Sequence, residues 1–219
     1  MSQLNNMNVT AIVPAFNEEN TISHVLEALL NTAEVDRVIV VSDGSTDNTV
    51  EIARRHGVEV IDLLTNRGKG GAIKAGLDVT GTEVILFLDA DLIGLKPDHI
   101  KTLLEPVLND RADMSVGLFE KGRVATDFAQ KLTPFLSGQR ALKRTILEDI
   151  SDLDITRFGV EYALHTYAEE ANLRMEEVEL KDLSHVMKEE KMGFWKGSAA
   201  RVKMYWEIVC SVLKLNNLS

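Results

Sequence analysis

The sequence lacks the features that define several protein classes. Its 219 residues contain one cysteine, Cys210, so no disulfide can form within the chain. Cys210 lies in an apolar stretch, Ile208 to Leu213, and we expect a buried structural thiol. No run reaches the roughly 18 to 20 apolar residues of a membrane span, and Met1 to Thr10 lack the charged start and apolar core of a signal peptide. These absences predict a cytoplasmic protein.

Positive charge is also scarce. The chain has 24 Lys and Arg residues against 34 Asp and Glu residues, a formal net charge of −10. Nucleic-acid-binding proteins normally carry a basic surface, so this balance argues against such a partner. An anionic substrate has to be held by local Lys and Arg side chains, because the overall field repels it. The sequence also contains no internal repeat or linker, so we expect one domain over residues 1–219.

Short apolar runs alternate with segments of helical periodicity in the first half of the chain. The predicted strands are 9–13, 38–41, 58–61 and 83–88, and the predicted helices are 20–30, 46–56, 70–78 and 97–109. This alternation predicts an α/β fold with a mostly parallel central sheet flanked by helices.

The second half is less regular. Its predicted strands are 114–118 and 175–180, its predicted helices are 138–150 and 160–170, and residues 181–193 read as a polar loop. Residues 194–219 form a predicted C-terminal amphipathic helix. Its apolar stripe suits packing in the core or in a homodimer, and the basic residues beside the stripe leave peripheral membrane contact as an alternative.

Polar residues follow three of the predicted strands at the point where each strand ends. Pro14 to Glu18 follow the first strand, Asp43 follows the second, and Asp89 and Asp91 follow the fourth. In an open parallel sheet the ligand binds beyond the carboxyl ends of the strands. We therefore expect these clusters to meet at one edge of the sheet and to form a site there.

The Asp89-Ala90-Asp91 turn can hold a metal ion. Two carboxylates two residues apart on a turn suit Mg²⁺ or Mn²⁺, which prefer oxygen ligands and often share them with substrate phosphates. Such a cation would neutralise a leaving diphosphate. The motif alone is weak, since a solvated turn also explains it, and its place after a buried strand is what favours a site.

Two further segments have chemistry that suits a nucleotide. Asn66 to Gly71 is a glycine-rich, basic loop that opens a helix, where backbone N–H groups favour phosphate, although the spacing is not that of a Walker loop. Asp43 can accept a hydrogen bond from a base or a ribose hydroxyl. His185 lies alone in a polar segment and is by itself no evidence for a metal site.

Together these segments resemble glycosyltransferase family 2, whose members have the GT-A fold. The matching motifs are Ile12 to Glu19, Val41 to Asp47, Asn66 to Gly70 and Leu88 to Asp91, in the family's order. The resemblance covers roughly residues 8–120 and implies a single Rossmann-like GT-A domain, with a nucleotide-sugar-binding half at 8–120 and an acceptor-binding half at 121–193.

The resemblance implies roles for individual residues. Asp91 would bind the metal and, with Lys69 and Glu161, would be catalytic. The residues expected to bind the nucleotide sugar are Pro14, Ala15, Asn17, Glu18, Asp43, Lys69, Asp89 and Ala90.

The second half is similar to a narrower group, the glucosyl-3-phosphoglycerate synthases. The matching segments are Ser137 to Ala141, Phe158 to Glu161 and the later His185. This similarity implies that Gly138, Gln139 and Arg140 bind the acceptor and that His185 completes the metal site. Gln139 is not ionisable, so a catalytic base would have to be Glu161, Asp152 or Asp154.

The function implied is the metal-dependent transfer of a hexose from a nucleotide diphosphate sugar to a small anionic acceptor such as a phosphoglycerate. UDP-glucose is the favoured donor and GDP-mannose the next, Mg²⁺ or Mn²⁺ is the cofactor, and the stereochemical course is open. The alternatives are a polyprenyl-phosphate glycosyltransferase with a lipid-phosphate acceptor, a nucleotidyltransferase, and a non-catalytic nucleotide-sugar-binding module.

Overall fold

The computed structural model describes residues 7–119, 137–149 and 160–185. The chain divides into two compact units, Met1–Ser184 and His185–Ser219, and the fold given below is that of the first. The C-terminal segment 194–219 and the candidate bases Asp152 and Asp154 lie outside the described residues. One domain over the whole chain therefore stays a prediction.

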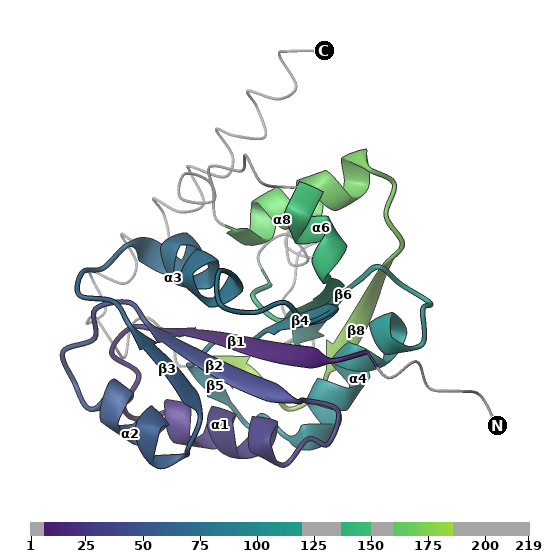
Figure 1. The fold of residues 1–219 in the computed structure, drawn as a ribbon. Coiled ribbons are helices and arrows are strands. Elements are labelled where there is room, and N and C mark those ends of the chain that lie inside the picture. Colours follow the sequence, from purple (N-terminus) through teal and green to yellow (C-terminus); the bar gives the residue numbers. More distant parts are fainter. Residues whose placement is uncertain (1–6, 120–136, 150–159, 186–219) are drawn as a thin grey trace, which may run out of the picture. The chain divides into compact units, whose positions relative to one another are not determined.

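The centre of the molecule is a seven-stranded sheet in the order β3-β2-β1-β4-β7-β6-β8 (Figure 1). Every neighbouring pair is parallel except the two pairs that β7 makes with β4 and β6. The strands are β1 (Val9–Ala15), β2 (Arg37–Ser42), β3 (Glu59–Asp62), β4 (Val84–Phe87), β6 (Met114–Phe119), β7 (Arg140–Lys143) and β8 (Met175–Leu180). A short second sheet pairs β5 (Leu92–Ile93) with β9 (Ser184–His185). The predicted α/β fold with a mostly parallel sheet is confirmed.

Helices cover both faces of the sheet (Figure 1), so the central strands β1, β2 and β4 are buried on both sides. One apolar core includes residues of α1 (Ile22–Leu30), α2 (Thr49–Arg55) and α4 (Pro97–Leu108). The other includes residues of α3 (Gly68–Leu77), α6 (Arg144–Asp149) and α8 (Val160–Glu170). Successive side chains of a strand point to opposite faces: Ala11 and Val13 of β1 belong to the first core and Ile12 to the second.

None of the described helices is long and apolar enough to cross a bilayer. The longest of them, α4, has 12 residues, whereas a membrane-spanning helix needs about 20.

The predicted helix at 138–150 is wrong in its first half. Arg140–Lys143 form β7, which lies antiparallel between β4 and β6, and only Arg144–Asp149 are helical. Ala141 packs in one core and Leu142 in the other, so this short segment is buried on both faces of the sheet. The local sequence pattern of this segment suits either a helix or a strand. Its place between β4 and β6 in the sheet decides for the strand.

The predicted helix at 46–56 begins three residues later, at Thr49. Backbone N–H groups before and at this start donate to side chains in the loops. The backbone N–H of Thr46 donates to Asn17 Oδ1 at 2.8 Å, and that of Thr49 donates to Asp47 Oδ1 at 3.0 Å. These contacts hold Ser45 to Asn48 as a loop at the edge of the sheet.

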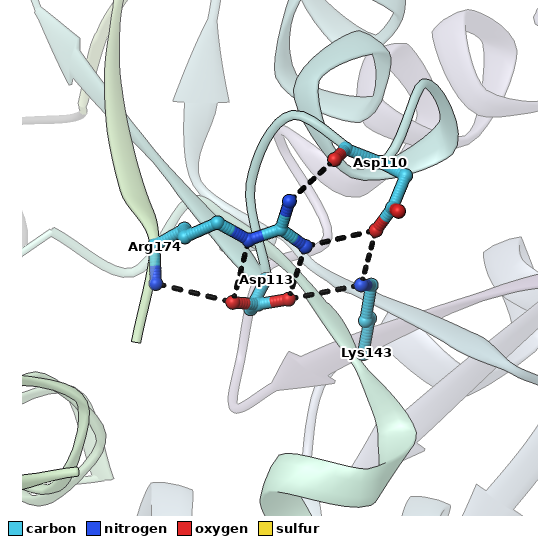
Figure 2. Close-up of polar contacts among 4 residues, drawn as sticks. All are labelled: Asp110, Asp113, Lys143 and Arg174. Carbon is cyan, nitrogen blue, oxygen red and sulfur yellow. Dashed lines mark hydrogen bonds and ion pairs between the residues drawn. The ribbon is translucent and has the colours of Figure 1, made fainter. Parts of the chain in front are cut away.

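An ion network joins β6, β7 and β8 at the end of the sheet where β6 and β8 begin (Figure 2). Asp113, which precedes β6, accepts from Arg174 and from Lys143, with contacts of 2.8 and 2.9 Å. Asp110, in the turn after α4, pairs with the same two cations. The hydrogen bonds from Arg174 lower the pKa of Asp113; burial opposes them and Lys143 adds to the lowering. The network fixes the ends of β6, β7 and β8 relative to α4.

Replacing the shared carboxylate should destabilise the protein in a pH-dependent way. Because the folded-state pKa of Asp113 is depressed, its contribution is present above the unfolded value of about 3.9 and is lost as pH falls below it. We expect Asp113→Asn to lower the melting temperature near neutral pH by about 2–4 °C or more, since about 1 kcal/mol produces that shift in a chain of this size.

The control is Asp78→Asn, which breaks an exposed pair with Lys74 and should change stability by less than about 0.5 kcal/mol. Thermal unfolding monitored by circular dichroism measures both variants. A deficit for Asp113→Asn that is equally large below about pH 3.9 would contradict this account, because the carboxyl is then largely protonated in the unfolded chain.

Candidate functional site at the carboxyl edge of the sheet

The predicted clusters meet at one edge of the sheet. β1 lies between β2 and β4, and all three run in the same direction, so their carboxyl ends are adjacent. Ala15 is in register with Ser42, the backbone N–H of Asp43 donates to the carbonyl of Ala15 at 2.8 Å, and Leu88 bonds to Ile12 on the other side. The loops after β1, β2 and β4 therefore form one surface.

Side chains interlock the loops after β1 and β2. Asn17 takes a left-handed backbone conformation, with φ of 56°, and its Oδ1 accepts from Thr46 while its N–H donates to Ser45 Oγ. The N–H of Glu18 donates to Thr49 Oγ1 at 2.7 Å. Glu19 Oε2 accepts from both nitrogens of Asn48, the backbone N–H at 3.1 Å and the side chain at 2.8 Å. A nucleoside bound here would meet loops that are already ordered.

Asp43 ties in the loop after β3. Its carboxylate is nearly buried, with 4% of the residue exposed, and Oδ1 accepts from the backbone N–H of Arg67 at 2.7 Å. The neighbouring Gly44 has φ of +74°, and a Cβ there would lie 3.0 Å from the nitrogen of Asn66. Asp43 thus fixes the position of the loop Asn66 to Gly71 in the absence of any ligand.

Lys69 joins three distant parts of the chain. Its Nζ lies 2.5 Å from Asp89 Oδ1, after β4, and also contacts Glu161 Oε1, in the first turn of α8. Burial works to lower the pKa of Lys69, but the carboxylates of Asp89 and Glu161 raise it far more, so the side chain is a cation at any physiological pH. Two of the residues expected to be catalytic and one expected to bind the donor are therefore in direct contact.

The antiparallel direction of β7 brings the predicted acceptor segment to the same edge. Phe87 pairs with Arg140, so the residues before Arg140 lie beside Asp89. A Cβ on Gly138 would come within 2.4 Å of Asp89 Oδ2 and within 2.6 Å of Lys69 Nζ. Any side chain at this position would have to displace the ion pair.

The side chains of Gln139 and Arg140 are buried rather than displayed at the surface. Gln139 is 0% exposed and its Nε2 donates to Asp89 Oδ2 at 2.8 Å. Arg140 is 1% exposed, and its Nε donates to the carbonyl of Ser137. Burial lowers the pKa of Arg140 to about 10, opposed by Glu161, so the guanidinium stays charged. Acceptor binding by these residues stays a prediction.

The remaining predicted residues also lie at this edge. Pro14 is half-buried, whereas Ala15 and Ala90 are each 3% exposed and pack in the core, which leaves only their backbones for a ligand. Phe16, to which the sequence assigned no role, is 48% exposed on the loop after β1. Its only signal in the sequence was its place inside the first motif.

The donor set at Asp91 fits a hard cation that shares a substrate's phosphates. Asp91 is partly exposed on the turn between β4 and β5. Both oxygens of Asp89 already accept hydrogen bonds, from Lys69 and Gln139. Within residues 7–119, 137–149 and 160–185, no three His, Cys, Asp or Glu side chains form a complete metal site. Mg²⁺ is commonly held by one or two carboxylates together with substrate phosphates, so one carboxylate here is sufficient protein ligation.

The chain that leads to His185 runs beside β5, the strand that follows Asp91. The carbonyl of Asp182 lies where a Cβ on Gly94 would approach to 2.6 Å, so residues 182–184 pass beside the strand that follows Asp91. The side chain of His185 lies outside the described residues, and its role as a second metal ligand stays a prediction.

Comparisons with known proteins identify the family of this chain. The model of glycosyl transferase family 2 matches residues 10–164. An uncharacterized protein of Methanocaldococcus jannaschii is 31% identical, covering 83% of this chain and 85% of that protein. A 4,4'-diaponeurosporenoate glycosyltransferase of Staphylococcus aureus is 37% identical over 105 residues, which are 46% of this chain and 28% of that enzyme. The chain thus spans less than a third of the length of the Staphylococcus enzyme.

Solved structures of glucosyl-3-phosphoglycerate synthase from Mycobacterium tuberculosis have the same fold. The complex with Mn²⁺, UDP and glucosyl-3-phosphoglycerate has a TM-score of 0.70 and 27% identity, covering 82% of this chain and 72% of that one. A complex with Mg²⁺ and UDP gives a TM-score of 0.67, with the same identity and coverage. The predicted GT-A fold is confirmed.

The crowding at Gly138 gives a direct test of the site. We expect Gly138→Ala to displace the Asp89–Lys69 pair, because the added Cβ would lie within 3 Å of both side-chain ends, and to cost about 1 kcal/mol of stability through the weakened hydrogen bonds. Gly81→Ala is the matched control, since a Cβ at Gly81 meets nothing within 4 Å. Urea unfolding measures both variants, and equal midpoints for the two would contradict the observed packing.

Proposed function

Because the chain belongs to glycosyl transferase family 2, we propose that it transfers a hexose from a nucleotide diphosphate sugar to an acceptor, with Mg²⁺ or Mn²⁺ as cofactor. The observation that carries this proposal is the contact between Lys69 and Asp89 at the carboxyl edge of the sheet. It joins the glycine-rich loop to the turn that bears Asp91, next to the interlocked loops after β1 and β2. Such an edge is where open α/β sheets bind nucleotides.

UDP-glucose is the donor we propose, with GDP-mannose as the second candidate. The proposal is supported by the synthase structures, which contain UDP or UDP-glucose with Mn²⁺ or Mg²⁺. In this chain the loops that bear Pro14, Asn17, Glu18 and Asp43 would take the nucleoside. Asp89 would face the ribose or the sugar.

The charges of the site explain why a cation would be needed. Lys69 contacts both Asp89 and Glu161, and both carboxylates compete with a diphosphate for it. A divalent ion at Asp91 supplies the positive charge that neutralises the leaving diphosphate. Lys69 would then stabilise the departing oxygen atoms, an electrostatic contribution of the kind worth roughly 10²- to 10³-fold in rate.

Glu161 is the described candidate for a base. Its carboxylate contacts Lys69, so it lies next to the atoms that would carry the reaction. A general base must reach the proton of the acceptor hydroxyl within about 3 Å. Asp152 and Asp154 stay alternatives outside the described residues.

The acceptor we propose is a small anionic molecule of the phosphoglycerate type. The synthase complexes support it, because they include phosphoglyceric acid and glycerol 3-phosphate. A lipid acceptor is the second candidate, since the Staphylococcus relative is a glycosyltransferase for 4,4'-diaponeurosporenoate rather than for a phosphoglycerate.

A thermal-shift panel tests the donor and the cofactor together. The parent protein is heated with UDP, UDP-glucose, GDP or GDP-mannose, each with Mn²⁺, with Mg²⁺ or with a chelator. We expect stabilisation by UDP and UDP-glucose only when a divalent ion is present. A ligand at 100 times its Kd adds about 2.7 kcal/mol by mass action, which raises the melting temperature by several degrees in a chain of this size.

Asp91→Asn should remove the metal-dependent part of the shift, whereas Asp98→Asn, an exposed carboxylate on α4, should keep it. Glucose transfer is then measured with 3-phosphoglycerate and with polyprenyl phosphate in liposomes. Release of pyrophosphate rather than UDP would indicate a nucleotidyltransferase. A parent protein that no nucleotide stabilises, with either metal, would overturn the proposal.

A further inference from the structure

The carboxylate of Asp89 is held by two different donors. Oδ1 accepts from the ammonium of Lys69 at 2.5 Å and Oδ2 accepts from the amide Nε2 of Gln139 at 2.8 Å. One donor on each oxygen fixes the plane of the carboxylate as well as its position. Lys69 is 35% exposed along its side chain and can turn toward a ligand, but Gln139 cannot.

Gln139 is buried at the carboxyl edge of the sheet, where both its backbone and its side chain are hydrogen-bonded. None of its surface is exposed. Its backbone carbonyl accepts from the N–H of Gly117 at 2.8 Å, and its Oε1 lies 3.1 Å from Ser137 Oγ, which fixes the orientation of the amide. A Cβ on Gly117 would come within 3.2 Å of Gln139 Cβ, so Gly117 leaves the space that Gln139 fills. A fully covered side chain has no surface for a substrate, and the polar group that its Nε2 reaches is Asp89.

The buried guanidinium of Arg140 is hydrogen-bonded to the backbone of the same segment. Its Nε donates to the carbonyl of Ser137 at 2.9 Å, and the backbone of Arg140 pairs with Phe87 in the sheet. Gly138 then passes so close to Asp89 that no side chain fits between them. The segment Ser137 to Arg140 is therefore a clamp on Asp89, with Gln139 as its hydrogen-bond donor.

We propose that Gln139 is a positioning residue that orients the carboxylate of Asp89 toward the donor sugar or ribose, rather than a contact for the acceptor. The role of Asp89 toward the donor rests on the proposed function; the clamp itself does not. Gln139 matters through its N–H, so its effect on the protein must pass through Asp89.

The amide suits this position better than a charged group. The site already holds two carboxylates, Asp89 and Glu161, around the ammonium of Lys69. A third carboxylate at position 139 would have no proton to donate and would repel Asp89. A second cation would compete with Lys69 for Asp89 and weaken its contact. A neutral amide donates a hydrogen bond to Asp89 and leaves the net charge of Asp89, Glu161 and Lys69 unchanged.

A double-mutant cycle tests whether Gln139 acts through Asp89. The variants are Gln139→Met, which keeps the length of the side chain without the donor, Asp89→Ala, and the pair. Two properties are measured: urea unfolding without ligand, and the affinity for Mn²⁺ with UDP-glucose by calorimetry. We expect Gln139→Met to weaken UDP-glucose binding roughly 10-fold in the parent, the loss typical of one hydrogen bond to a charged group. In the Asp89→Ala background it should change binding by less than about twofold.

The control cycle combines Gln139→Met with Thr80→Val. The buried hydroxyl of Thr80 donates to Thr10 Oγ1 at 3.0 Å near the start of β1, at the opposite edge of the sheet. Thr80→Val should lower stability, leave UDP-glucose affinity unchanged and add to Gln139→Met within about twofold in the unfolding constant. Gln139→Glu has the shape of the parent side chain without its N–H donor. It should bind UDP-glucose no more tightly than Gln139→Met does.

The outcomes separate the clamp from the proposed function. If Gln139→Met and Asp89→Ala are additive in unfolding, the clamp is overturned. If they are coupled in unfolding but Gln139→Met weakens UDP-glucose binding equally with and without Asp89, the positioning role is overturned. If the parent binds neither UDP-glucose nor GDP-mannose, the proposed donor fails while coupling in unfolding still supports the clamp. Asp89→Leu, which has nearly the shape of the parent side chain and accepts no hydrogen bond, replaces Asp89→Ala in the cycle if the latter does not fold.

Discussion

The ammonium of Lys69 is the contact on which the arrangement of the site depends. It lies in the first turn of α3 and binds carboxylates from the end of β4 and the start of α8. These segments are up to 92 residues apart in sequence, from Lys69 to Glu161. Without the cation, two carboxylates would face each other in a protein that is already acidic. Lys69 therefore has a structural role before any substrate binds, and a diphosphate bound as proposed would have to draw it partly away from those carboxylates.

The sheet supplies the second constraint. Parallel pairing of β1 with β2 and β4 places the carboxyl ends of the three strands side by side. The hydrogen bonds of Asn17, Glu18 and Asp43 then join the loops that follow into one surface. The antiparallel strand β7 is what carries the glycine of the clamp to the same edge. Preordered loops reduce the entropy lost when a ligand binds. The ion network of Asp110, Asp113, Lys143 and Arg174 holds the opposite ends of β6 to β8 (Figure 2).

Much of the fold and of the site's location could be predicted from the sequence. Apolar runs that end in Pro14, Asp43 and Asp89 identify parallel strands and the edge where their polar residues meet, because that edge follows from strand direction alone. The strand at Arg140–Lys143 could not be predicted, since its two apolar residues, Ala141 and Leu142, are adjacent and buried in different cores, so the segment shows no alternation of apolar and polar residues. The burial of Gln139 and its bond to Asp89 also depend on how strand β7 is placed between β4 and β6. No local pattern contains that information.

The central claim is that a metal–nucleotide complex binds at the carboxyl edge of the sheet, next to Asp91. Paramagnetic broadening of backbone amide signals by Mn²⁺ with UDP tests this claim most directly. The account predicts UDP-dependent broadening of residues 15–17, 43–45 and 88–92. It predicts none in the hollow at the opposite edge, which includes Leu29, Leu30 and Gly57 to Glu59. Broadening at that hollow, or broadening that does not depend on UDP, would contradict it.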